Sequence, residues 1–358
     1  MPVPPHPLLD DPVGQVQSMV RFELVDASSM QPTDAVAVLD AASVSFNGTG
    51  NIHRTLSGVR ISEKVLRDIN PFTDLLRLWW VLGDGSEWPL GAFAFGDLPR
   101  RVSSGVDTLD AVLNDQGDWF EAETGRTFSM GPRGLIISLV ENVLDYYGVP
   151  YTSRVVPTSN DTRALDPIGY PATATANTIL RRCSELLGCL PPYFDNVGNF
   201  VMRPPPDVDR TDADLVYLTG GGRMIAGTLV QNDNLLSAPN LFRVVGSGPS
   251  SASIVGEATV HPDLPFSREQ RRRTVSRTIE VQGLSSMDQA RDIARSYAAA
   301  VDGYESWEFD ALADPRHDGY MLVAVDDKVY RELGWSLTLR PGGPHHHQLT
   351  AGGFPVAG

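Results

Sequence analysis

Three consecutive histidines, His345 to His347, are the residues of this sequence that most directly suggest chemistry. Imidazole nitrogens are frequent zinc ligands, so a histidine cluster could bind a metal ion. Successive side chains of an extended chain point to opposite sides, however, and three neighbours rarely form a tetrahedral site. The segment around them is rich in glycine and proline. We therefore predict a solvated tract and assign no metal-binding residues.

The segment 314–319, Asp-Pro-Arg-His-Asp-Gly, is a second candidate for chemistry. His317 and Asp318 could take part in acid–base catalysis, but a general base needs a positioned partner and a pocket. The sequence contains no Gly-x-Ser-x-Gly elbow that would present a nucleophile. Aspartate and glycine are typical of tight turns, so we predict a loop between two strands and assign no catalytic residue.

Neither glycine-rich segment, Gly220–Gly222 nor Gly246–Gly248, has the spacing of a phosphate-binding loop, so no cofactor is predicted. The two cysteines, Cys183 and Cys189, lack a histidine or a second cysteine pair at zinc-ligand spacing. Cys183 also falls on the apolar face of a predicted helix. A structural thiol is therefore the better interpretation.

Two alternatives remain open. Acidic residues are abundant, so a pair of carboxylates beside a cleft would suit a glycosidase. Tryptophans could line a sugar-binding groove, although strand-like surroundings favour a place in the core or at a subunit interface. The tryptophans concerned are Trp79, Trp80, Trp88 and Trp119.

The overall charge argues against nucleic-acid binding through phosphates, which requires clustered lysine and arginine. The 358 residues carry a formal net charge of −15. The one basic run, at Arg268 and Arg271–Arg273, is interpreted as a solvated loop. No secretory signal is evident, and the longest apolar block, Leu75–Leu82, is too short to span a bilayer.

The first third of the chain has strand and hairpin patterns. Apolar and polar residues alternate from Val20 to Leu24, and Asn47-Gly48 is a hairpin-turn signal before a partner strand at 52–61. A second hairpin is predicted where Leu75–Leu82 ends in the turn sequence Gly-Asp-Gly-Ser.

Two helices are predicted in the middle of the chain, at about 135–147 and 176–187, because apolar residues recur there at helical spacing. A strand–turn–strand at 193–202 follows them. A third helix begins at Ser286, with Gln289 completing a capping box, among several short β-like runs.

These patterns predict a mainly β chain with an α/β insert. The predicted units are an extended proline-rich arm at 1–14, an N-terminal β-barrel-like domain at 15–125, a helical α+β insert at 126–205, a second β-barrel-like domain with one capped helix at 206–340, and a flexible tail at 341–358.

Three stretches together resemble the minor tail proteins, or tail hub proteins, of long-tailed phages that infect actinobacteria. The first is 106–120, and the second is the helix followed by 193–206. The third runs from His261 through the arginine run and the capped helix to the strand at 320–325. The third resemblance rests on the order of its elements, which is loop, basic stretch, strand, capped helix, strand and turn.

The resemblance implies two β-barrel-like domains with helical elements between and beside them. Related hubs form trimers, in which two barrels per chain give a ring of pseudo-sixfold symmetry. It implies a structural protein of the virion, assembled in the host cytoplasm, that joins the tail tube to the tip around the DNA exit channel. Expected partners are a distal tail protein, a tape measure protein and further minor tail proteins.

We expect no enzymatic activity, no cofactor, no membrane contact and no specific nucleic-acid binding. We also expect acidic side chains along the channel, where they would keep DNA from adhering. The alternatives are a tail-associated cell-wall hydrolase and a carbohydrate-binding receptor module.

Overall fold

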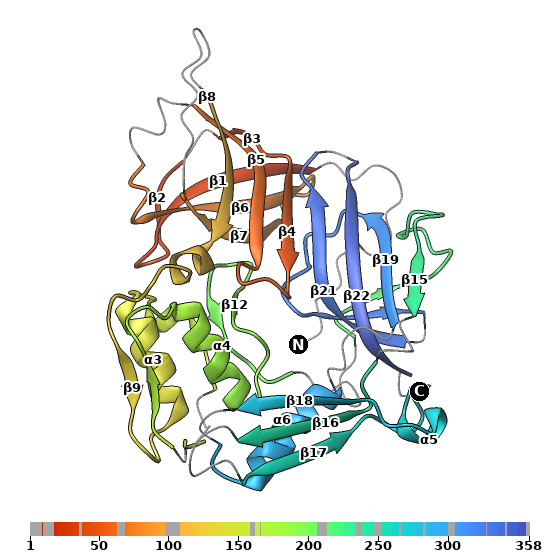
Figure 1. Ribbon diagram of the computed structural model, residues 1–358. Helices are drawn as coiled ribbons and strands as arrows, with labels where there is room; N and C mark the ends of the chain where they lie inside the picture. Colours follow the sequence, from red (N-terminus) through yellow and green to blue (C-terminus); the bar gives the residue numbers. More distant parts are fainter. Residues whose placement is uncertain are drawn as a thin grey trace.

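The computed structural model of the chain (Figure 1) is mainly β, as predicted. It describes residues 9, 18–35, 38–62, 69–96, 108–157, 162–164, 166–205, 213–233, 238–246, 253–264, 266–281, 284–299, 305–326, 328–340 and 342–355. The predicted proline-rich arm lies outside these residues except for Leu9, which is buried in the core of the N-terminal strands.

The N-terminal strands form antiparallel hairpins. They are β1 (Ser18–Asp26), β2 (Pro32–Ala35), β3 (Val38–Asp40), β4 (Ser43–Asn47), β5 (Arg54–Ser62), β6 (Asp74–Leu82), β7 (Glu87–Ala94) and β8 (Thr108–Asp115). The pairs β4–β5 and β6–β7 confirm the two predicted hairpins. In the second, Gly85 has a φ of +88°, which explains why the turn sequence contains glycine.

The C-terminal strands lie beside them (Figure 1). They are β14 (Leu215–Tyr217), β15 (Val230–Asp233), β19 (Glu305–Leu312), β20 (Leu322–Val325), β21 (Lys328–Thr338) and β22 (Pro344–Pro355). Strand β21 pairs with β4, with Trp335 opposite Phe46 and Leu337 opposite Val44. Both groups of strands therefore belong to one sheet.

The path of that sheet is open in the described part of the chain. Its order is β15-β19-β22-β21-β4-β5-β8-β7-β6-β1-β2, with β3, β14 and β20 attached at its side. The expected mainly β architecture is confirmed, but the two β-rich units share a sheet rather than closing into separate barrels. Among the described helices, none is long and apolar enough to cross a membrane.

The insert between the two groups of strands contains the two helices predicted for the middle of the chain. Its elements are η1 (Gln116–Phe120), β9 (Phe128–Met130), α3 (Ile136–Tyr146), η2 (Tyr151–Ser153), β10 (Arg154–Val155), β11 (Ile168–Tyr170), α4 (Ala176–Leu186), β12 (Tyr193–Phe194) and β13 (Phe200–Val201). After α3, Gly148 adopts a φ of +70°, as expected of a residue that ends a helix.

A second small unit lies within the C-terminal half. It consists of β16 (Leu241–Gly246), β17 (Val255–Thr259), α5 (Arg268–Arg271), β18 (Ser276–Val281) and α6 (Met287–Ala299). Its buried residues, such as Phe242 and Ile293, share one hydrophobic core with Leu139 and Leu180 of the insert. Figure 1 shows both units on the same side of the large sheet.

The capping box of α6 is present in a shifted form. The Ser286 hydroxyl accepts a hydrogen bond from the backbone N–H of Gln289 at 3.0 Å. The Gln289 side chain accepts one from the backbone N–H of Ser285, at 2.6 Å, rather than from that of Ser286. The predicted start of the helix is therefore correct to within one residue.

The prediction of a flexible tail at 341–358 is wrong for Pro344–Pro355. These residues form β22, which pairs with β19 on one side and β21 on the other. Pro344 and Pro355 stand at the ends of the strand, where their missing N–H groups disturb the ladder least. Pairing on both sides satisfies the backbone, and the side chains of His345, His347 and Leu349 are buried.

Candidate functional site

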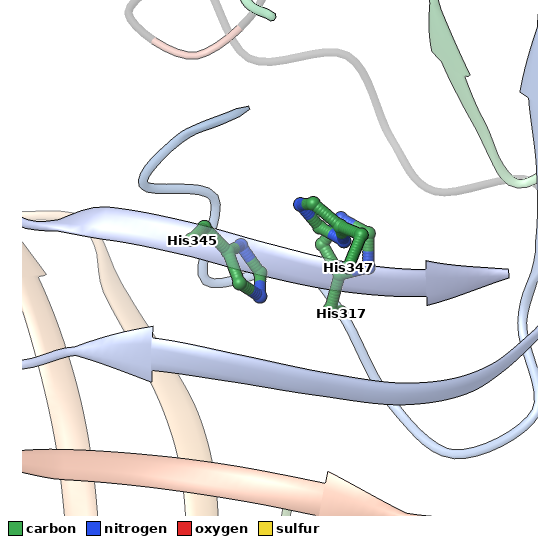
Figure 2. A group of neighbouring side chains, drawn as sticks. All are labelled: His317, His345 and His347. Atoms are coloured by element: carbon green, nitrogen blue, oxygen red, sulfur yellow. The ribbon is translucent and has the colours of Figure 1, made fainter. Parts of the chain in front are cut away.

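Strand β22 places two of its three histidines on one buried face. His345 and His347 are fully buried, whereas the intervening His346 points the other way and contacts Asp310 at 2.8 Å. A further buried histidine, His317, lies next to these two and comes from the loop between β19 and β20. Figure 2 shows the three rings gathered at the strand. The prediction of a solvated histidine tract is therefore wrong for His345 and His347.

The three rings are in direct contact. The centroid of His347 lies 4.1 Å from that of His345 and 4.6 Å from that of His317. Aromatic side chains enclose the group: Phe309 stacks on His347 at 4.8 Å, and Trp335 meets His345 edge-on at 5.5 Å. The cluster is thus enclosed by other aromatic rings inside the C-terminal group of strands.

Glu332 of β21 links two of the histidines. Its two carboxylate oxygens accept hydrogen bonds from Nδ1 of His317 at 2.6 Å and from Nδ1 of His347 at 2.7 Å. Because a carboxylate only accepts, both Nδ1 atoms carry hydrogen. In a neutral ring this leaves the lone pair on Nε2. The lone pair of His317 Nε2 accepts a hydrogen bond from the Tyr217 hydroxyl at 2.8 Å.

The remaining ring nitrogens have little to bind. Among the described residues, Nε2 of His345 and Nε2 of His347 are buried without a hydrogen-bond partner. Nδ1 of His345 has one long contact, 3.4 Å from the backbone N–H of Asp314. One ligand nitrogen from each of the three histidines can be chosen so that all lie within 4.8 Å of one another.

Burial keeps the cluster uncharged at neutral pH. It lowers the pKa of His317 and of His347 to about 4, and that of His345 well below its ordinary value of 6.5. Burial also raises the pKa of Glu332, against the hydrogen bond from His347 that favours its charged form.

A buried ion-pair network borders the histidines. Asp314 is completely buried and pairs with Arg316 at 2.9 Å and with Arg223. Burial alone would raise its pKa, but the hydrogen bond from Arg316 and the nearby positive charges lower it instead. Asp314 is therefore ionised and offsets one of the two positive charges that the arginines place beside the cluster.

The segment 314–319 is a loop between two strands, as predicted, but its two candidate residues separate. His317 joins the histidine cluster, whereas Asp318 pairs with the buried Arg54 of β5. Arg54 also donates to the backbone oxygen of Phe194 at 3.0 Å and thereby ties the N-terminal strands to the insert. Asp318 and His317 thus do not form an acid–base pair.

Sequence reasoning missed Glu332 and Tyr217 as members of the site. Neither lies near the histidines in the sequence, and Tyr217 is 100 positions from His317. A usable signal did exist, because the outer two residues of a His-His-His run in a strand share one face. It required recognising 344–355 as a strand.

Two other candidate residues, Cys183 and Trp80, lie in hydrophobic cores. Cys183 is buried in the core of the insert, and burial raises its thiol pKa to about 12. Trp80 is buried among the N-terminal strands, as a core role predicts.

A cleft between α4, α6 and β21 is lined by one carboxylate, that of Glu185, and its described lining contains no tryptophan. It therefore offers neither a carboxylate pair nor a stacking surface for sugar.

No family model and no curated protein matches the chain. Solved structures do match. A tail protein from Neisseria meningitidis has a TM-score of 0.60 at 10% identity, over 93% of this chain and 97% of that one. The 43 kDa tail protein of prophage MuSo2 from Shewanella oneidensis has a TM-score of 0.59 at 11% identity, over 93% and 98%.

A prophage tail protein from Listeria monocytogenes is also similar, with a TM-score of 0.53 at 9% identity over 93% of this chain and 94% of that one. At such identities the likeness concerns the fold. The chain shares nearly its whole architecture with these three proteins, and not merely one small unit of it.

Proposed function

We propose that the chain is a structural component of a phage tail, the hub of its tip, and that it has no catalytic role. The supporting observation is the extent of the fold similarity, which includes 93% of this chain and 97% of the Neisseria meningitidis tail protein. A shared small domain would be weak support, because one fold can serve many functions. Similarity along nearly the whole of both chains is stronger support.

We further propose that three copies form a ring between tail tube and tip. Two groups of strands in each chain would give such a ring six β-rich units, which suits the sixfold tube that it would join. A distal tail protein, a tape measure protein and further minor tail proteins are the proposed partners. The virion of a long-tailed phage of actinobacteria is the proposed location.

The open sheet supplies a candidate contact surface for the ring. Within the described residues, the sheet path ends at β15, and exposed apolar side chains gather near that edge: Ile225, Leu229 and Val230. Open edges and apolar patches favour association with another chain. We expect Val230→Lys to prevent incorporation into tails. Met287→Lys, at a similarly exposed position on α6, is the control and should assemble normally.

The acidic composition suggests how the channel would treat DNA. With a net charge of −15, the chain can present carboxylates to the lumen and repel the passing phosphates. A lumen lined mainly by arginine would refute this part of the proposal.

Electron cryo-microscopy of the tail tip of a particle that carries this chain tests the proposal. We expect a threefold ring of density that fits the chain at the end of the tube, with a continuous lumen. Density on the tail periphery, or none at the tip, would refute the hub assignment. Cleavage of host cell wall by the purified chain would instead support the hydrolase alternative.

A further inference from the structure

We propose that His317, His345 and His347 bind a divalent transition-metal ion of the zinc class, which fixes the loop after β19 to the middle of the C-terminal strands. The three side chains come from two separate segments, the β19–β20 loop and β22, and meet inside the protein (Figure 2). Their ligand nitrogens lie within 4.8 Å of one another.

The position of Glu332 is the observation that favours a metal over a simple packing of aromatic rings. Histidines that bind metals usually donate their second N–H to a carboxylate, which fixes the tautomer and orients the ring. Glu332 does this for His317 and His347 at once, at 2.6 and 2.7 Å. Both rings thereby direct a lone pair from Nε2 away from the carboxylate. That of His347 has no partner among the described residues, whereas that of His317 accepts the Tyr217 hydroxyl, which a bound ion would have to displace.

The partnerless nitrogens supply the second observation. Nε2 of His345 and of His347 are buried, and no described residue hydrogen-bonds to them. Buried polar atoms nearly always have partners, because burying them alone costs stability. Nε2 of His347 carries a lone pair and can bind a cation directly. His345 accepts the N–H of Asp314 at Nδ1, so its neutral ring must change tautomer to bind the same cation through Nε2.

The donor set points to a zinc-class ion. Neutral imidazoles suit zinc, copper, iron and nickel, whereas calcium and magnesium prefer oxygen. Tetrahedral zinc with Zn–N bonds of about 2.0–2.1 Å needs nitrogens about 3.3 Å apart. Nitrogens that lie within 4.8 Å of one another must therefore approach by up to about 1.5 Å when the ion binds. The Tyr217 hydroxyl, 2.8 Å from His317 Nε2, lies next to the fourth position. A site so completely buried suits a structural rather than a catalytic ion.

Two arginines and two carboxylates border the histidines, so these four groups add no net positive charge that would oppose a cation. Arg316 and Arg223 stand near the histidines, and both pair with the ionised Asp314. Glu332 then contributes a negative charge beside the proposed ion. Because all three histidines are buried, we expect the ion to enter as the protein folds rather than afterwards.

The test uses the full chain with an affinity tag that contains no histidine. The protein is produced with zinc in the medium, and its metal content is measured by mass spectrometry. We expect about one zinc ion per chain, at the single site proposed. Refolding from denaturant with cobalt(II) should give the absorption bands of a tetrahedral ion. Refolding with a chelator should lower the melting temperature. Metal-free protein without cobalt bands would overturn the proposal.

Two variants locate the ion. His347→Gln should lose the zinc and the cobalt bands. His346→Gln is the matched control, because this residue is on the same strand but faces the other way, and it should retain both. Loss of the metal in His346→Gln, or its retention in His347→Gln, would overturn the assignment. If His347→Gln fails to fold, the cobalt spectrum of the unaltered chain still decides the question.

Discussion

His53 should make the stability of this protein depend on pH. It lies just before β5 with an exposure of 4%, stacks on Phe46 at 5.8 Å, and contacts the backbone oxygen of Asn47 through Nδ1 at 3.0 Å. Burial lowers its pKa from 6.5 to about 4, because the surroundings disfavour the charged ring. The folded protein must therefore hold this residue neutral.

The sign of the effect follows from proton binding. Between pH 6.5 and 4 the unfolded chain binds a proton at His53 and the folded chain does not, so acid favours unfolding. The contribution is fully present above pH 6.5 and is lost as the pH falls towards 4. The difference in pKa corresponds to about 3 kcal/mol in total, and to about 2 kcal/mol at pH 5.

The assay is urea unfolding between pH 5 and 8 of the unaltered chain and of His53→Phe. Phenylalanine keeps the ring contacts with Phe46 but cannot be protonated. We expect the variant to lose about 2 kcal/mol less stability than the unaltered chain on going from pH 8 to pH 5. Because the other histidines are present in both proteins, their contributions cancel. Identical pH profiles would refute the reasoning that His53 is buried in its neutral form.

Two further substitutions and one thiol reaction test how Arg54, Gly256 and Cys183 are packed. Arg54→Met should lower the free energy of unfolding in urea by about 3 kcal/mol, because it removes a buried cation that links β5, the insert and Asp318. A decrease of less than about 1 kcal/mol would contradict this. Gly256→Ala should lower the free energy of unfolding by about 2 kcal/mol, because a Cβ there would lie 2.3 Å from the backbone of α6. Gly222→Ala is the control and should leave the free energy of unfolding unchanged, because open space surrounds that position. The thiol of Cys183 should resist a thiol reagent in the folded protein and react after denaturation, because burial raises its pKa to about 12; rapid reaction of the folded protein would refute its placement.

Local sequence patterns were sufficient for two hairpins and the three longer helices of this protein, whereas the basic run interpreted as a loop contains the short helix α5. The turn at Gly83–Ser86 predicts the β6–β7 hairpin, and the apolar spacing from 135 to 147 predicts α3. Each of these elements depends on residues close together in the chain. The pairing of β4 with β21 depends on residues from opposite ends of the chain, and no local pattern specifies it. The single open sheet was therefore not predictable from the same signals.

The histidine cluster shows the same division between local and distant information. Alternation along a strand would place His345 and His347 on one face, which needs only local sequence. Their burial depends on β19 and β21, which pair with β22 on its two sides. Glycine and proline at 341–344 and 352–355 are typical of loops and concealed that strand. Glu332 could be assigned to the site only after β21 was placed next to β22.

The low identity to the similar tail proteins changes what the fold similarity can say about individual residues. At 9–11% identity, the shared architecture must rest mainly on patterns of apolar and polar residues, which many sequences can satisfy. A group of buried polar side chains is a stricter demand, because every member needs a partner. Glu332, His317, His345, His347 and Tyr217 meet that demand only in part, since two imidazole nitrogens have no partner among the described residues. The cluster must therefore be explained by this chain's own chemistry, and a bound cation would complete it without altering the fold.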